Sequence, residues 1–236
     1  MTIKNNIVRI APSDISFLAN CPHCLWHKYH TGLKHGSTFP GVFSILDISQ
    51  KNYFNPLGTK EISSDLPDGE VDLKIADKFI TSKVLYDLEG RSFQLGGKAD
   101  LILKFNDGTY GVIDNKTTKI KDSQDYYFYQ LECYATILEY PDASTSEKFF
   151  SANGVDCYSP VTHLGLSMFE PSKIIDHSKE TITQLYARKW QAVERNPKKL
   201  LEKITSIMDV ISAPECPDAS SCDRCKLYLN ALEAAK

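Results

Sequence analysis

The spacing of apolar side chains changes twice along the chain. Near the N-terminus apolar residues recur every three or four positions, which is typical of amphipathic helices. In the middle apolar and polar residues alternate, which predicts strands with one face on a core. Toward the C-terminus the helical spacing returns. The pattern predicts an α+β or α/β three-layer domain, with helices before and after a mostly antiparallel sheet that a helix interrupts.

Proline, glycine and turn chemistry set the limits of the expected elements. We expect helices over residues 12–30 (interrupted near Pro22), 40–54, 123–140, 173–196 and 198–211. We expect strands within 71–90, in a hairpin over 96–118, and around 147–158 and 162–170, with a loop over 56–69.

The hairpin over residues 96–118 has a turn that fixes its register. Two apolar runs flank Asn106-Asp107-Gly108, and glycine adopts the left-handed conformation that a three-residue hairpin loop requires. Phe105 then pairs with Thr109. The position numbers of paired residues in this hairpin therefore sum to 214.

The same register places two carboxylates opposite each other. Asp100 and Asp114 also sum to 214, so their Cβ atoms are expected about 5 Å apart. Like charges at that distance are destabilising unless they are neutralised, and Mg²⁺ or Mn²⁺ prefers carboxylate oxygen. Lys116 projects from the same strand face as Asp114, where it can activate a water or offset charge on a phosphate. The alternative is that these are scattered acids of a surface hairpin, since an acid-x-Lys tripeptide is common.

Composition and charge limit the possible functions. The chain has 236 residues, 42% of them hydrophobic and 24% charged, as in soluble globular proteins. We expect a single domain over 1–236 with a core at about 40–170. The net charge of −3 argues against a broad basic surface, so any nucleic acid would bind in a local cleft. No apolar run reaches the length of a membrane span, and the first ten residues lack a signal-peptide core. We therefore expect a cytoplasmic protein.

Seven cysteines, an odd number, fit a reducing compartment. Four of them form two Cys-x-x-Cys pairs, Cys21 with Cys24 and Cys222 with Cys225. Together the pairs offer four thiolates for zinc or an iron–sulfur cluster, which would clasp residues 13–30 to residues 212–236. The alternatives are two unrelated pairs or a redox pair. Cys133 and Cys157 lie alone in apolar contexts and are expected to be buried filler.

Three short motifs in series resemble the PD-(D/E)xK nuclease superfamily, and specifically its RecB-like branch. They are Gly97-Lys98-Ala99-Asp100, Asp114-Asn115-Lys116, and Gln130 with Tyr134 on the following helix. The resemblance implies a restriction-endonuclease-like core, a central mixed sheet flanked by helices. It also implies that Asp100, Asp114 and the backbone carbonyl of Asn115 bind the catalytic metal, and that Lys116 is catalytic.

The resemblance assigns roles to residues on two helices as well. Gln130 and Tyr134 would line the DNA groove or support Lys116. The family also places an acid or a histidine on an earlier helix. Asp47 is the best candidate for this further metal ligand, with His30 and His35 as rivals.

The cysteines extend the resemblance. The stretch LANCPHC is similar to the Leu-x-x-Cys-Pro opening of RecB-like nucleases, of which AddB-type and CRISPR-associated members join their ends through a 4Fe–4S cluster. Cys21, Cys222 and Cys225 match that ligand set, but its last position falls near Ala231. Cys24 or Cys216 would supply the fourth thiolate, and we prefer Cys24. Iron–sulfur and zinc both remain open.

The sequence therefore predicts a stand-alone, Mg²⁺- or Mn²⁺-dependent DNA nuclease, most simply an exonuclease on single-stranded DNA or duplex ends. Aromatic residues near the cleft would stack on bases, though such tyrosines are also ordinary core and surface residues: Tyr126, Tyr127, Tyr129 and Tyr134. No P-loop accompanies the motifs, so the chain would receive its DNA already opened or would rely on a partner such as a helicase. Two other hypotheses stand. One is a non-catalytic nucleic-acid- or protein-binding module with a structural zinc, and the other is a subunit active only in a DNA repair, recombination or CRISPR-adaptation complex.

Overall fold

The computed structural model describes residues 3–4, 7–16, 20–32, 41–54, 57–72, 74–75, 78–120, 125–151, 154–219 and 222–234. In this part of the chain the strands form two sheets of five strands each. The first sheet contains β1 (Ile3–Lys4), β2 (Ile7–Ile10), β4 (Ile80–Thr81), β5 (Leu85–Tyr86) and β6 (Ser92–Gly97). The second sheet contains β3 (Gly69–Val71), β7 (Leu101–Phe105), β8 (Tyr110–Thr117), β9 (Val161–His177) and β10 (Ile182–Val193).

Both sheets are mixed. The second sheet has the order β10-β9-β8-β7-β3, and only its β8–β9 pair is parallel. The first sheet has the order β1-β2-β6-β4, with β5 also on β6, and only its β2–β6 pair is parallel. The predicted mixed sheet flanked by helices is thereby confirmed.

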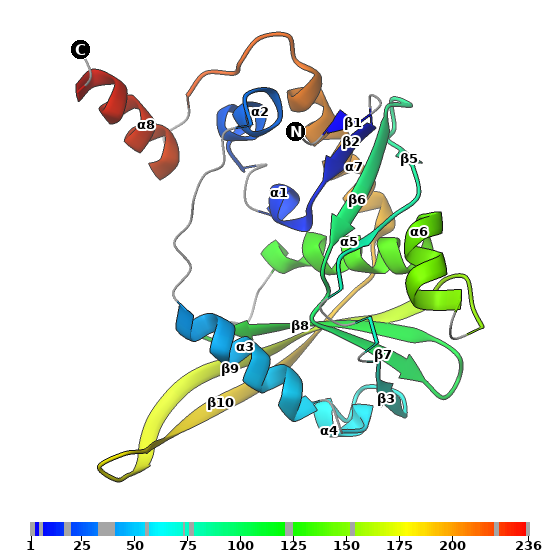
Figure 1. Cartoon of the computed structure of the whole chain (residues 1–236), viewed down its shortest axis with the longest axis vertical. Coiled ribbons are helices and arrows are strands. Elements are labelled where there is room, and N and C mark those ends of the chain that lie inside the picture. Colours follow the sequence, from blue (N-terminus) through cyan, green and yellow to red (C-terminus); the bar gives the residue numbers. More distant parts are fainter. Residues whose placement is uncertain are drawn as a thin grey trace.

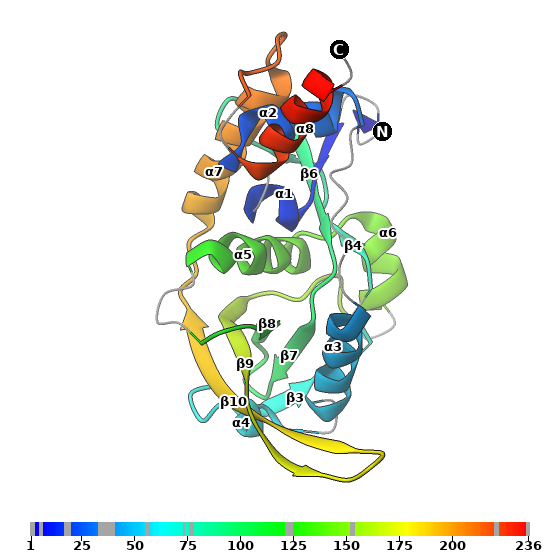
Figure 2. The same cartoon turned by 90° about the vertical axis from the view of Figure 1, so that its left-hand side faces the viewer.

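Helices cover both faces of the second sheet (Figures 1 and 2). The helices in the described part of the chain are α1 (Pro12–Ser16), α2 (Pro22–His30), α3 (Gly41–Phe54), α4 (Thr59–Ile62), α5 (Asp125–Glu139), α6 (Ala143–Thr145), α7 (Pro197–Ser212) and α8 (Asp223–Ala234). Helix α5 connects the parallel strands β8 and β9 and lies between the second sheet and the layer formed by α1, α2 and α7. Pro22 and Pro197 each stand in the first turn of a helix, where the missing N–H costs no hydrogen bond.

Two separate cores fix this arrangement. On the α5 face of the second sheet, Val112 and Leu166 pack with Leu131 of α5 and with residues of α7. On the opposite face, Ile113 packs with Phe54 of α3. Because neighbouring strand residues point to opposite faces, β8 contributes to both cores, and Asp114 and Lys116 point toward α5.

The structure confirms several predicted elements and corrects others. The predicted helices over 40–54, 123–140 and 198–211 correspond to α3, α5 and α7, and the predicted interruption at Pro22 separates α1 from α2. The predicted loop over 56–69 contains the short helix α4.

The strand predicted around 147–158 is wrong. The segment instead begins in a π-helical turn, Ser146–Phe150, which directly follows helix α6. The Asp142 side chain starts this helical segment by accepting a hydrogen bond from Thr145 N at 2.7 Å. Phe150 and Tyr158 of this segment are buried in the core without strand pairing.

The helix predicted over 173–196 is also wrong, because this segment forms the end of β9 and all of β10. Ser178 reverses the chain: its N–H donates to Thr181 O at 2.8 Å, and its Oγ accepts from Thr181 N at 3.0 Å. The two strands then pair along their length, from Ile182 with His177 to Val193 with Leu164. Pairing with β9 therefore overrides the helical spacing of the apolar residues.

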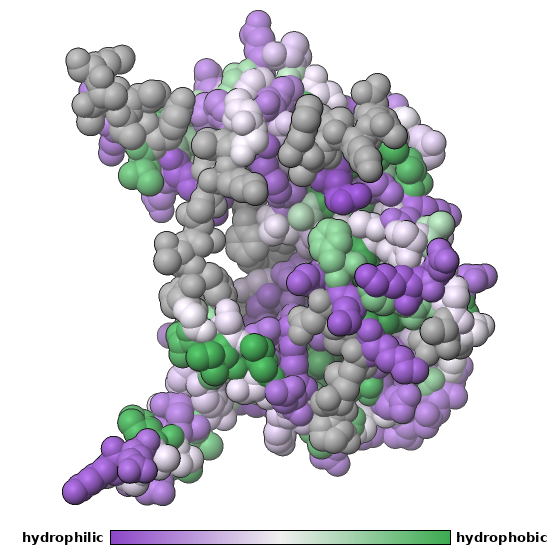
Figure 3. All heavy atoms as spheres, in the orientation of Figure 1, coloured by the Kyte–Doolittle hydropathy of each residue, from purple (hydrophilic) through white to green (hydrophobic). Residues whose placement is uncertain are grey.

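The β9–β10 hairpin extends beyond the rest of the molecule (Figures 1 and 2). Its outer part carries exposed apolar side chains, among them Ile174 and Ile182. A second exposed apolar group, which includes Val42, Ile45 and Ile48, lies on α3 and is visible as a hydrophobic patch in Figure 3. Among the helices of the described residues, none has the length and apolar character needed to cross a membrane.

Candidate active site

The register predicted for the β7–β8 hairpin is confirmed. Leu101 pairs with Ile113 and Lys104 with Tyr110, so that partners sum to 214. At the turn, Phe105 N donates to Thr109 O at 2.9 Å. One prediction about this segment is wrong, since Gly96 and Gly97 belong to β6 of the first sheet and pair with β4.

Gly97 allows the first sheet to approach α5 closely. A Cβ atom at this position would lie 2.9 Å from Tyr134 Cε1 and 3.0 Å from Pro12 Cγ. Since real Cβ contacts are not that short, any side chain here would displace Tyr134. The glycine and the tyrosine of the two motifs are thus in direct contact across two elements.

Asp100 lies one residue before β7 and is held from two sides. Its Oδ2 accepts a hydrogen bond from the backbone N of Asn115 at 2.9 Å. Its Oδ1 is 3.1 Å from Nζ of Lys51, which lies on α3 and has only 10% of its side chain exposed. Asp100 is thereby fixed at the end of β8 that carries the second carboxylate.

Asp114 is almost fully buried, with 1% of its surface exposed. Its Oδ1 accepts a hydrogen bond from Gln130 Nε2 at 2.9 Å, and its Oδ2 forms an ion pair with Lys116. Burial raises the pKa of Asp114 to about 7; the Asp100 charge acts in the same direction, and Lys116 opposes it. The two carboxylates therefore influence each other, as the hairpin register predicts.

Gln130 connects the carboxylate to the lysine and to α5. Its Nε2 donates to Tyr134 Oη at 3.2 Å as well as to Asp114, while its Oε1 accepts from Lys116 Nζ at 3.5 Å. Burial alone would lower the pKa of Lys116, but the neighbouring Asp114 carboxylate outweighs it and raises that pKa. Lys116 Nζ also lies 4.7 Å from the ring centre of Tyr127. The motif residues of β8 and α5 thus form one connected group.

Asp47 is connected to this group through a lysine. Its Oδ2 is 2.8 Å from Lys51 Nζ, and the same ammonium contacts Asp100. Sequence reasoning missed Lys51, although its position four residues after Asp47 on a helix was a usable signal. Lys51, with its two acidic partners, thus lies on the helix where the resemblance implies an acid or a histidine as a metal ligand.

The other predicted candidates lie elsewhere or outside the described residues. His30 Nε2 lies 2.7 Å from Ile211 O of α7, and its ring stacks on Trp26 at 4.0 Å, so it joins helices and is not part of the carboxylate group. His35 and the Tyr126 side chain lie outside the described residues. The ring of Tyr129 faces Lys199.

This donor set fits a hard divalent cation. Asp100 and Asp114 supply carboxylate oxygens from adjoining strands, which is the ligand type that Mg²⁺ and Mn²⁺ prefer. The ammonium groups of Lys51 and Lys116 lie against the same carboxylates, so positive charge already collects at this position. Such an arrangement can bind a cation and place a lysine beside a phosphate.

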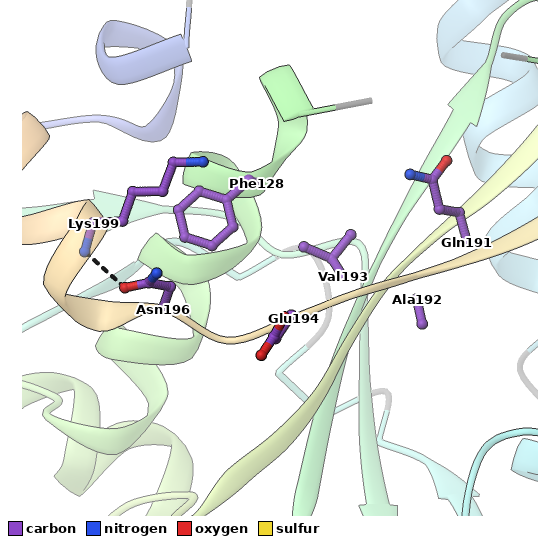
Figure 4. Close-up of a pocket in the computed structure, with 7 residues that line it drawn as sticks. All are labelled: Phe128, Gln191, Ala192, Val193, Glu194, Asn196 and Lys199. Atoms are coloured by element: carbon purple, nitrogen blue, oxygen red, sulfur yellow. Dashed lines mark hydrogen bonds between the residues drawn. The ribbon is translucent and has the colours of Figure 1, made fainter. Parts of the chain in front are cut away.

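A cavity of about 330 Å³ opens on the same face of the second sheet (Figure 4). Gln191 of β10 pairs with Leu166 of β9, which in turn pairs with Asp114, so the cavity begins two strands from the carboxylate, about 10 Å away. Gln191 Oε1 is buried and has no hydrogen-bond partner among the described residues. Phe128 and Lys199 form the other side, with Lys199 Nζ 4.8 Å from the Phe128 ring centre.

The four cysteines of the two Cys-x-x-Cys pairs form a second candidate metal site, built from the two ends of the chain. Cys21 precedes α2 and Cys24 lies in its first turn, while Cys222 and Cys225 stand at the start of α8. The Sγ atom of Cys21 lies 3.4 Å from that of Cys222 and 3.5 Å from that of Cys225. The Sγ atom of Cys24 lies 3.7 Å from each of the Sγ atoms of Cys222 and Cys225. The predicted clasp residues are therefore brought together.

The segment after α7 also runs along α2 and contacts it. Trp26 Nε1 donates to Ala213 O at 2.9 Å, and His23 Nδ1 lies 2.9 Å from Pro217 O. These contacts guide the chain from the end of α7 across α2 to the cysteines of α8 (Figure 1). Cys133 is buried in the main core and Cys157 is half-buried, both outside the cysteine group.

Comparisons with known proteins agree with the geometry. The model of the PD-(D/E)XK nuclease superfamily matches residues 51–228, which include both carboxylates and the second cysteine pair. The crystal structure of SSO0001 is similar in fold, with a TM-score of 0.52 and 12% sequence identity, over 91% of this chain and 81% of that chain. At that identity the likeness shows the fold alone. No curated protein matches the chain.

Proposed function

The chain belongs to the PD-(D/E)XK nuclease superfamily, and on this premise we propose that it is a Mg²⁺- or Mn²⁺-dependent deoxyribonuclease. Nucleases of this superfamily use divalent metals. The observation that carries the proposal is the convergence of Asp100, Asp114, Lys116 and Gln130 on one buried position at the end of the β7–β8 hairpin.

Each residue has a role that follows from its contacts. Asp100, Asp114 and the carbonyl of Asn115 would hold the cation, which supplies an activated water and charge stabilisation for phosphodiester hydrolysis. Gln130 orients the Asp114 carboxylate and Lys116 together, since it bonds to both. Lys116 then offsets the charge that develops on the phosphate. Lys51 keeps Asp100 in place until the cation binds.

A single strand of DNA is the substrate class that the surroundings favour. The cavity beside the site combines an aromatic ring, Phe128, with a cation, Lys199, and a buried acceptor, Gln191 Oε1. Stacking on an aromatic ring and contact with a basic side chain are how proteins bind unpaired bases and their phosphates. The net charge of −3 agrees with binding in a local cleft instead of over a broad surface.

For the cysteine clasp we propose a single zinc ion. Four thiolates around one tetrahedral zinc lie about 3.8 Å apart, given Zn–S bonds of about 2.3 Å. The Sγ–Sγ distances of 3.4–3.7 Å between the two pairs are close to this value. In a four-iron cluster each cysteine binds a different iron, so the thiolates would be farther apart. The spacing thus favours zinc over the iron–sulfur alternative.

A nuclease that works within a complex is the second candidate. Exposed apolar side chains on α3, such as Ile45, and on the outer β9–β10 hairpin, such as Ile182, favour it because large exposed apolar groups often mark contact surfaces. A repair, recombination or CRISPR-adaptation partner, or a helicase, would then bring the opened DNA.

The decisive experiment is cleavage of end-labelled single-stranded DNA, duplex DNA and RNA with Mg²⁺, with Mn²⁺ or without divalent ions. Asp114→Asn is the test variant, and Asp107→Asn, in the exposed turn of the same hairpin, is the matched control. Metal-dependent cleavage of DNA that is lost only in Asp114→Asn supports the proposal, and the product ladder gives polarity. If folded protein cleaves nothing with either metal, the proposal of a stand-alone enzyme is wrong. If it prefers RNA, the proposal of a DNA substrate is wrong.

A further inference from the structure

A third group of metal-ligating side chains lies on α2 and on the segment that follows α7. It consists of His23, His27 and Cys216, whose ligand atoms all lie within 4.8 Å of one another. This group is separate from the four cysteines of the clasp, which form a complete set of their own. Cys216 therefore does not replace Cys24 in that set.

The helix brings the two histidines to one face. His23 and His27 are four residues apart on α2, so their side chains lie one above the other. Their ring centres are 4.5 Å apart, with an angle of 64° between the ring planes. The spacing is one that histidine pairs on helices use to bind zinc.

Cys216 completes the group from a distant part of the chain. Its Sγ lies 3.3 Å from His23 Nδ1. An imidazole nitrogen and a thiolate on the same tetrahedral zinc are about 3.5 Å apart, given bonds of about 2.0–2.1 Å and 2.3 Å. All three residues are half-buried, so the group is sheltered but open to an ion from solvent.

We propose that His23, His27 and Cys216 form a second zinc site, distinct from the cysteine clasp. Neutral imidazole and thiolate are ligands that zinc prefers, and three protein ligands leave one coordination position. The Pro217 carbonyl oxygen lies beside the group, 2.9 Å from His23 Nδ1 and 3.5 Å from Cys216 Sγ. Zinc here joins residues 216–217 to α2 and adds a tie between the two ends of the chain.

The site can be counted independently of the clasp ion and of nuclease activity. Full-length protein is loaded with zinc, freed of loosely bound metal by gel filtration, and analysed for zinc and iron per chain by elemental mass spectrometry. We expect Cys216→Ser and His27→Gln each to bind about one zinc ion fewer than wild type, which is one ion per tetrahedral site. Cys157→Ser, a half-buried cysteine outside both groups, and His177→Gln, on the exposed hairpin, should bind as much as wild type.

Counting iron as well as zinc makes the result independent of which metal the clasp holds. If Cys216→Ser fails to fold, as judged by circular dichroism, His27→Gln decides. Cobalt titration of wild-type protein gives a second measure. The clasp has four thiolates and the proposed site has one, so cobalt binding at the two sites should give thiolate-to-cobalt absorption bands of different intensity. The titration phase with the weaker band, which belongs to the proposed site, should vanish in His27→Gln. Equal metal content in wild type, Cys216→Ser and His27→Gln, with a single cobalt phase, would overturn the proposal.

Discussion

The carboxylate site and the cysteine clasp are built in opposite ways. The site takes most of its residues from one hairpin and the helix that follows it, and hydrogen bonds between neighbouring strands set its geometry. The clasp joins Cys21 to Cys225, 204 positions apart, at helix ends. A site made by local register can lose its chemistry without losing the fold. A clasp that closes almost the whole chain should do the reverse, because removing it frees both ends.

The largest expected effect is on cleavage. Asp114→Asn and Lys116→Met should each reduce the cleavage rate by roughly 10²–10³-fold or more, because charge stabilisation at the phosphate is lost. Melting temperatures, measured by circular dichroism at about pH 5, where Asp114 is protonated in the folded protein, should stay close to wild type. The controls Asp107→Asn and Lys119→Met, both exposed, should cleave normally. If the Lys116 variant unfolds, the contrast between the carboxylate site and the clasp fails, because the site would then also stabilise the fold.

The clasp should show the opposite behaviour. Cys225→Ser should lose the clasp metal and lower the melting temperature by roughly 10 °C or more, because metal binding at a site that closes a long loop is folding free energy. The cleavage rate per folded molecule, measured at low temperature, should change little. Cys157→Ser is the control. Normal stability of the Cys225 variant would mean that the clasp does not hold the ends together.

A smaller effect on cleavage is expected at Gln130. Gln130→Ala should lower kcat by about 10–100-fold, because residues that orient metal ligands and their neighbours have effects of that size. The melting temperature should change little. Gln184→Ala, on the exposed hairpin, is the control. If Gln130→Ala changes KM alone, Gln130 contacts the substrate and does not position Asp114.

The smallest effect is on stability as a function of pH. In metal-free protein the pKa of Asp114 is about 7, against an ordinary value of 3.8. Between these values the folded state keeps a proton that the unfolded state has released, so raising the pH lowers the free energy of unfolding. Denaturant unfolding of wild type and Asp114→Asn in magnesium-free buffer, from about pH 5 to about pH 8, should show wild type losing stability relative to the variant. A constant difference would contradict a raised pKa.

The sequence allowed prediction of those parts of the molecule that depend on local geometry. The turn at Gly108, with φ of +84°, determines which residues of β7 and β8 face each other, and hence the meeting of Asp100 with Asp114. Helical spacing likewise put Gln130 and Tyr134 on one face of α5. The pairing of two Cys-x-x-Cys motifs indicated the clasp without any knowledge of the fold.

Features that depend on packing between distant segments were missed. Lys51 reaches Asp100 only because α3 lies beside the end of β8, and a helical spacing pattern does not show which strand a helix will cover. The apolar residues of 173–196 fit a helix by spacing, and only the pairing of β10 with β9 makes this segment part of a hairpin. The cavity between Phe128 and Gln191 likewise joins a helix and a strand about sixty positions apart.

The clasp also has a mechanical consequence. Cys24 and Cys222 are 198 positions apart, so an ion bound to both would make nearly all of the domain a closed loop. Tension applied to the chain on either side of that loop passes through metal–thiolate bonds and bypasses the second sheet, whose strands all lie inside the loop. We expect a protein-unfolding motor pulling on one end to stall at the clasp, and single-molecule stretching to release the contour length of the loop only after the ion is lost.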